Sequence, residues 1–140
     1  GKSSLFWGPL GPIMRGLGGI PVDRSKPNQL VAQLAQRFKE TASLHLVIPP
    51  SGTRGFTEHW RSGFYHVARE ADVPVIFGFL DYSKKLAGIS LPQPMTGNVR
   101  LDMDGVRQFY RGIVGRYPAL ASRIALRDEA ETNHPRKQED

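Results

Sequence analysis

Apolar residues recur with a helical period in three parts of this chain. The first part is residues 25–42, where apolar side chains fall on one helical face and polar ones fill the other (the apolar face holds Leu30, Val31, Leu34, Ala35 and Phe38). Pro27 suits the first turn of that helix, where its missing N–H costs nothing. The same spacing predicts a second helix over residues 62–71 and a third over residues 104–116.

Shorter apolar runs bounded by Gly, Pro and polar residues predict strands. We expect three buried strands, then an edge strand and its extension (residues 20–22, 44–48, 73–80, 86–91 and 99–103). A strand, a helix and a strand between residues 44 and 80 form a βαβ unit with parallel strands and a right-handed crossover. The helix within residues 27–41 makes a second crossover. The expected fold class is therefore α/β, an open, mostly parallel sheet with helices packed on it.

Composition narrows the class of protein. The length of 140 residues fits one domain, which we place at residues 1–126, and the polar residues 127–140 are expected to form a disordered tail. Residues 4–19 are apolar and glycine-rich, so they belong either to the core or to a surface that faces a membrane. The absence of cysteine excludes disulfides, thiol catalysis and thiolate metal sites.

The net charge of +6 favours anionic partners, which include nucleic acid, lipid headgroups and phosphorylated small molecules. Apart from Lys84-Lys85 the basic residues do not cluster in the sequence, and no aromatic residues that could stack on bases alternate with them. Both observations argue against nucleic acid as a binding partner. No apolar run reaches the roughly 20 residues that a membrane-spanning helix needs.

Residues 49–55 are the strongest candidate for a site. The apolar run before them ends in two prolines, which cannot donate to a sheet, and a helix is expected to follow. Within Ser51-Gly52-Thr53-Arg54-Gly55, the glycines let the backbone approach a ligand and the guanidinium of Arg54 suits phosphate or carboxylate. The pattern predicts either an anion site or an ordinary strand-to-helix loop with a surface arginine.

Three separated segments have an order and spacing typical of one family. Residues 18–24 are G-G-I-P-V-D-R, residues 50–54 are P-S-G-T-R, and residues 73–76 are V-P-V-I. They resemble the G-x-x-F-I-D-R, P-E-G-T-R and V-P-I-V blocks of the glycerolipid acyltransferases, specifically the 1-acyl-glycerol-3-phosphate (lysophosphatidic acid) acyltransferases. The likeness extends from about Leu5 to about Ile124.

The resemblance implies an enzyme that moves a fatty acyl group from acyl-CoA or acyl-carrier protein to a phosphorylated glycerol acceptor, such as 1-acyl-glycerol 3-phosphate. It implies phospholipid biosynthesis at the cytoplasmic face of a membrane, without a cofactor or a metal. The expected partners are the thioester donor, a lysophospholipid or glycerol-phosphate acceptor and the membrane surface, and no nucleic acid. The resemblance assigns acceptor binding to five residues (Arg24, Ser51, Gly52, Thr53 and Arg54).

Two departures from the family pattern matter. Ser51 stands where glutamate is usual, which leaves the headgroup of the acceptor open. The catalytic His-x-x-x-x-Asp motif of the family, which precedes the first block, is absent, because the residues five positions after the four histidines are Pro50, Phe64, Ala71 and Glu139. We therefore assign no catalytic residue and expect an N-terminally truncated chain that is inactive alone.

Other chemistry-bearing residues support weaker predictions. His45 is expected to be an ordinary strand residue, and His66 with Glu70 a surface pair and not a metal site. Trp60 and Arg61 either shape the entrance for the acyl chain or headgroup, or Trp60 anchors the helix start and Arg61 is a surface charge. The alternative function is a non-catalytic basic module that binds anionic membrane or nucleic acid.

Overall fold

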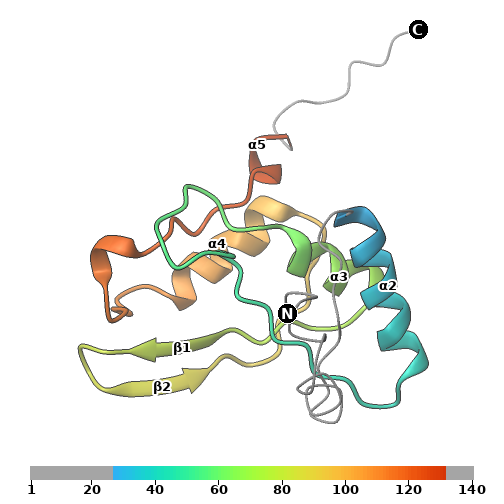
Figure 1. Cartoon of the computed structure of the whole chain (residues 1–140), viewed down its shortest axis with the longest axis horizontal. Coiled ribbons are helices and arrows are strands. Elements are labelled where there is room, and N and C mark those ends of the chain that lie inside the picture. The colour runs from blue at the N-terminus through green and yellow to red at the C-terminus, as the bar shows by residue number, and fades with distance from the viewer. Residues whose placement is uncertain (1–26, 132–140) are drawn as a thin grey trace, which may run out of the picture.

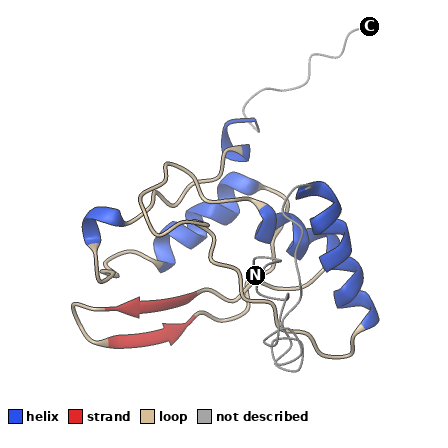
Figure 2. Ribbon diagram, in the orientation of Figure 1, coloured by secondary structure: helices blue, strands red, loops and turns tan. Residues whose placement is uncertain are grey.

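The structure, a computed structural model, describes residues 27–131 of the 140-residue chain. Its elements follow one another as α2 (Pro27–Glu40), α3 (Gly63–Ala71), β1 (Gly78–Asp81), β2 (Leu86–Ile89), α4 (Val99–Phe109), a 3₁₀ turn (Pro118–Leu120) and α5 (Asp128–Glu131). Figure 1 shows α2 beside α3, and α4 running over the hairpin that β1 and β2 form. Long irregular segments connect these elements (Figure 2).

Two of the predicted helices are confirmed. α2 lies within the predicted residues 25–42 and buries Leu34 and Ala35 from its apolar face. In α3, four of the residues that the spacing places inward are buried (Phe64, Tyr65, Val67 and Ala68). The helix ends at Ala71, and the left-handed backbone of the cap residue Asp72 (φ 54°) lets the N–H of Val73 donate to the carbonyl of Ala68 at 3.0 Å.

A helix replaces the strand that was predicted over residues 99–103. α4 begins at Val99 because the side-chain oxygen of Asn98 accepts a hydrogen bond from the N–H of Leu101 at 3.1 Å and caps the first turn. Met103 is completely buried, in a cluster that includes side chains of α3 and Phe77.

Both ends of the helix predicted over residues 104–116 were wrong. The helix begins five residues earlier and ends at Phe109, and Gly112 then takes a left-handed conformation with φ of 76°. Apolar spacing marks the inward face of a helix, whereas its ends depend on caps and on glycine.

β1 and β2 form an antiparallel hairpin, and β2 confirms the edge strand predicted within residues 86–91. Of the strand predicted over residues 73–80, only the last part belongs to β1. Upstream of it, Val75 makes an isolated antiparallel bridge with Gln93. The chain thus crosses this region as a partly paired extended segment and not as a long central strand.

The predicted parallel βαβ crossovers are not found in residues 27–131, where the sheet has two antiparallel strands. An open sheet with helices on it is compatible with this arrangement. Residues 44–48 form no strand; no described segment pairs with them, and Val47 is 91% exposed. An apolar run becomes a strand only when a neighbour completes its hydrogen bonds. The strand expected at residues 20–22 and the apolar residues 4–19 lie outside the described residues.

The core lies between α3, α4 and the segment that leads into β1. Phe77, which precedes β1, packs edge to face against Phe64 of α3 (centroids 6.3 Å apart) and against Tyr110 after α4 (6.2 Å). Met103 is buried in the same cluster, and the distant C-terminal segment contributes Leu126, which is 2% exposed. Segments far apart in the sequence therefore share one core.

Residues 128–131, which were expected to belong to a disordered tail, form the short helix α5. The Arg107 guanidinium donates to the carboxylate of Glu129 at 2.9 Å, and the N–H of Leu126 donates to the same carboxylate at 2.7 Å. These contacts tie α5 to α4. Residues 132–140 lie outside the described residues.

Candidate functional site

Hydrogen bonds within residues 49–55, the candidate loop, hold it in a defined shape. The N–H of Gly52 donates to the carbonyl of Pro49 at 3.1 Å and closes a turn, in which Gly52 has a positive φ of 65°. The Ser51 hydroxyl donates to the Thr53 carbonyl at 3.2 Å, and the N–H of Gly55 donates to the Thr53 hydroxyl oxygen at 3.2 Å. The loop therefore has a defined shape although it belongs to no helix or strand.

Arg54 lies on this turn with its side chain exposed, and within residues 27–131 it makes no hydrogen bond or ion pair. The backbone N–H groups of Thr53 and Arg54 likewise have no partner in that part of the chain. A guanidinium and two unbonded N–H groups on one turn can bind an oxyanion. Arg24, the other predicted phosphate ligand, lies outside the described residues, so its place beside this turn stays a prediction.

Arg61, which was expected either at the entrance for the acyl chain or headgroup or as a surface charge, lies against the same turn. A Cβ atom added to Gly52 would stand 2.5 Å from Nε and 2.8 Å from Cδ of Arg61, so this side chain passes directly over the glycine. The N–H of Arg61 also donates to the carbonyl of Pro50 at 2.8 Å. The arginine is exposed, and its guanidinium has no partner among the described residues.

The core fixes the backbone just before Arg61. The N–H of Trp60 donates to the carbonyl of Ala125 at 2.8 Å. The indole ring packs edge-on against Phe64 and Tyr110, with centroids 6.4 and 5.8 Å away. Of the two roles predicted for Trp60, the geometry favours anchoring the start of α3.

A cluster of polar groups joins α3 to the segment before α4 and to α4 itself, and these groups form hydrogen bonds with one another. The Tyr65 hydroxyl donates to Asp102 at 2.7 Å, and the N–H and hydroxyl of Thr96 donate to the same carboxylate at 2.9 and 2.8 Å. Burial, and then the bond to Asp102, raise the pKa of Tyr65 to about 12. The Arg69 guanidinium donates to the Met95 carbonyl at 3.1 Å. These bonds hold the segment before α4, which is a structural role.

The acyltransferase family model matches residues 1–76, which is more than half of the chain. The chain belongs to the acyltransferase family. The matched range contains the turn at residues 50–54 and the other two blocks of the resemblance. Neither a search of curated proteins nor a search of solved structures gives a match. Family membership supports acyl transfer as the type of reaction and an acyltransferase as the class of enzyme.

Acyl transfer to a hydroxyl needs a base, and two of the four histidines of this acyltransferase are placed as follows. His45 is exposed in an irregular segment, so its expected place in a strand was wrong. His66 of α3 lies with Nε2 3.0 Å from Oδ2 of Asp128, and thus links α3 to α5 instead of pairing with Glu70. Within residues 27–131, no three side chains of His, Asp or Glu are grouped to hold a metal ion.

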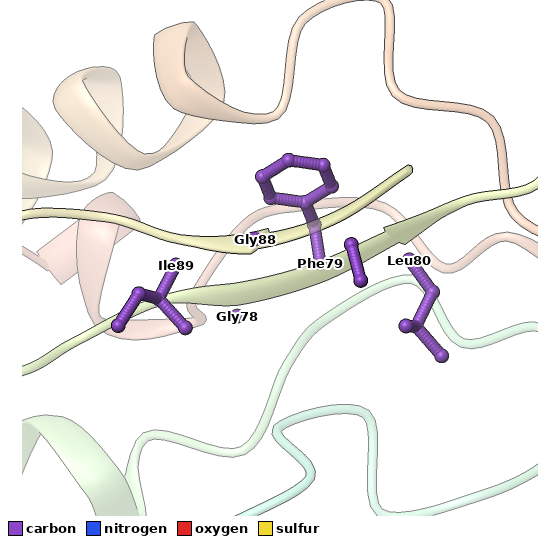
Figure 3. A pocket seen from close by; sticks show the side chains of 6 residues that line it. Gly78, Phe79, Leu80, Gly88 and Ile89 are labelled. Carbon is purple, nitrogen blue, oxygen red and sulfur yellow. The ribbon is translucent and has the colours of Figure 1, made fainter. Parts of the chain in front are cut away.

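The hairpin of this acyltransferase has one apolar face toward solvent. Leu80 and Ile89 are 61% and 73% exposed and line a shallow, open hollow there. Figure 3 shows both on the opposite side of the strands from Phe79, whose ring lies over Gly88 and contacts Phe109 of α4. In the described part of the chain, no helix has both the length and the hydrophobicity to span a bilayer.

Proposed function

We propose that this acyltransferase moves a fatty acyl group from a thioester, acyl-CoA or acyl-carrier protein, to a phosphorylated glycerol acceptor such as 1-acyl-glycerol 3-phosphate. The reaction would belong to phospholipid biosynthesis at the cytoplasmic face of a membrane. The observation that carries the proposal is the turn at residues 50–54, where Arg54 is exposed and has no partner within residues 27–131. The net charge of +6 adds attraction for an anionic acceptor and an anionic membrane surface.

The proposed role of the turn is to hold the phosphate of the acceptor. Arg54 offers a planar fork of N–H donors that can bond two phosphate oxygens at once. The N–H groups of Thr53 and Arg54 add donors, and Arg24 is proposed as a further phosphate ligand. Ser51 supports the shape of the turn through its bond to the Thr53 carbonyl, and Gly52 supplies the left-handed backbone.

Once the phosphate is held, the free hydroxyl of the glycerol can attack the acyl carbon of the thioester. The new ester bond forms, the carbon–sulfur bond breaks, and the sulfur leaves as a thiolate. A base takes the hydroxyl proton and the leaving thiolate receives a proton, so the reaction needs no further co-reactant. In the family that this chain resembles, the base is the histidine of His-x-x-x-x-Asp, and these 140 residues lack that motif. We therefore propose that the chain supplies the acceptor-binding half of the site and has no activity by itself.

The experiment is thioester-dependent acylation of 1-acyl-glycerol 3-phosphate. Residues 1–140 are compared with a longer chain, in which a segment that carries the His-x-x-x-x-Asp motif is joined before Gly1. We expect turnover only from the longer chain, and only with a phosphorylated acceptor. Turnover by residues 1–140 would place the base within them and overturn the half-site assignment. A longer chain that contains the His-x-x-x-x-Asp motif but acylates no phosphorylated acceptor would overturn the proposed function itself.

A further inference from the structure

Arg61 brings a second cation to the turn that carries Arg54, and neither has an ion-pair partner in the part of the chain that the structure describes. Its Nε and Cδ fill the space beside Gly52, at 2.5 and 2.8 Å from where a Cβ would stand. Its backbone is held on one side by the Pro50 carbonyl and on the other by Trp60, which packs on the core. The stem of Arg61 is therefore fixed against the turn while the residue stays exposed to solvent.

Within residues 27–131 no carboxylate neutralises either arginine. The ion pairs of this part of the chain use other cations, namely His66, Lys84 and Arg107. Like charges on Arg54 and Arg61 would repel each other at close approach, and an anion bound by both guanidinium groups would replace that repulsion with attraction. The more negative charge the anion carries, the better it offsets two cations, so the turn suits a dianion more than a monoanion.

We propose that Arg61 binds the acceptor phosphate together with Arg54 and makes the site select a phosphate monoester over a phosphodiester. The inference rests on the proposed function, because it specifies the acceptor of that reaction. A phosphate monoester carries a charge of about −1.5 to −2 at pH 7 and three terminal oxygens, which two planar forks can share. A diester carries a single charge and two terminal oxygens, so it leaves one fork incompletely bonded. Glycerol 3-phosphate and lysophosphatidate are monoesters, whereas lysolipids with a further headgroup alcohol are diesters.

The test is calorimetric titration of residues 1–140 with glycerol 3-phosphate, and with glycerophosphoglycerol as the matched diester. Arg61→Met keeps an unbranched stem over Gly52 and removes the charge, and Arg54→Met is the companion variant. Arg111→Met is the matched control, because Arg111 is exposed after α4 and its side chain has no described partner. We expect the unmodified chain to prefer the monoester. Arg61→Met should weaken monoester binding roughly ten- to a hundredfold and narrow the preference over the diester, as the loss of a charge-assisted bond predicts.

Circular dichroism and the melting temperature establish whether each variant is folded. If Arg61→Met unfolds, Arg61→Lys decides the question, because it keeps the stem and charge without the fork and should bind the monoester more weakly than the unmodified chain. Unchanged monoester binding by a folded Arg61 variant, with loss in Arg54→Met, would overturn the role of Arg61 and leave the proposed function standing. Equal losses in Arg61→Met and Arg111→Met would overturn it as well, because they would reflect overall charge. If the unmodified chain binds no monoester, or binds the diester equally well, the inference fails, and the acylation assay still decides the proposed function.

Discussion

Gly52 satisfies two separate constraints at the scale of single residues. Its φ of 65° lies in the left-handed region, where any side chain strains the backbone. The space beside its Cα is filled by Nε and Cδ of Arg61, a residue of a different segment. The first constraint would exist in an isolated turn, whereas the second exists only because the chain returns to the turn at the start of α3.

Gly52→Ala should therefore lower the free energy of unfolding by about 1–3 kcal/mol, from the left-handed strain and the collision with Arg61. In an Arg61→Ala background the collision disappears and the strain remains, so the same substitution should cost less. Urea denaturation of the unmodified chain, of Gly52→Ala, of Arg61→Ala and of the double variant measures this coupling. Gly63→Ala is the control, because a Cβ there meets nothing within 4 Å. Equal costs of Gly52→Ala in the two backgrounds would contradict the close approach of Arg61.

The sequence predicts only those parts of the candidate site that are formed by residues close together in the chain. The turn at residues 50–54 was found because prolines and glycines mark turns in the sequence itself, and Arg54 stands between two glycines. Arg61 was predicted to lie either at the substrate entrance or on the surface, but its contact with Gly52 was not predicted, because no spacing rule connects residues 52 and 61. Their contact depends on Trp60, which is fixed by Ala125 and by core aromatics.

At the scale of elements, helices were predicted better than strands, of which only the edge strand β2 and the last part of residues 73–80 were confirmed. A helix closes its hydrogen bonds within itself, so apolar spacing alone located α2 and α3. The start of α4 had a sequence signal that was overlooked, since Val99, Met103 and Val106 recur at helical spacing behind the cap Asn98. A strand depends on a neighbour, and residues 44–48 have none in the described part of the chain.

The hairpin depends on one acidic side chain at its turn. Oδ1 of Asp81 accepts hydrogen bonds from the Ser83 hydroxyl at 2.6 Å and from the N–H groups of Ser83 and Lys84 at 3.0 and 3.2 Å. The Ser83 hydroxyl is the largest cause that lowers the pKa of Asp81 to about 2, with burial acting in the opposite direction. The charged carboxylate is thus favoured in the folded hairpin relative to the unfolded chain.

The stability of the protein should consequently depend on pH through Asp81. Its contribution is fully present above the unfolded pKa of about 4 and is lost as the pH falls through the folded pKa of about 2. Asp81→Asn should unfold at a lower urea concentration than the unmodified chain at about pH 6, and the gap should close between about pH 4 and pH 2. Urea titrations across this range measure the gap, with Glu70→Gln on the exposed side of α3 as the control for removing one carboxylate. A gap that does not change with pH would contradict the role of Asp81.

At the scale of the whole molecule, the range matched by the family and the folded unit do not coincide. The match ends at residue 76, yet the core that fixes the candidate turn uses residues far beyond it. Ala125 receives the bond from Trp60, the N–H of Arg123 donates to the carbonyl of Thr57 at 3.0 Å, and Leu126 is buried in the core. The C-terminal segment therefore helps to position Arg61 although it lies outside the matched range.

Removing residues 118–140 should test this dependence. A chain that ends at Tyr117 loses the burial of Leu126, worth about 1.5–3 kcal/mol, and the carbonyl that fixes Trp60. We expect it to melt at a lower temperature and to bind glycerol 3-phosphate more weakly, because Arg61 is no longer held against the turn. A chain that ends at Glu131 keeps Leu126 and the Ala125 carbonyl, and it should match the full chain in both measurements. If the chain ending at Tyr117 melts and binds like the full chain, the C-terminal segment does not position the turn, and the site depends on the matched range alone.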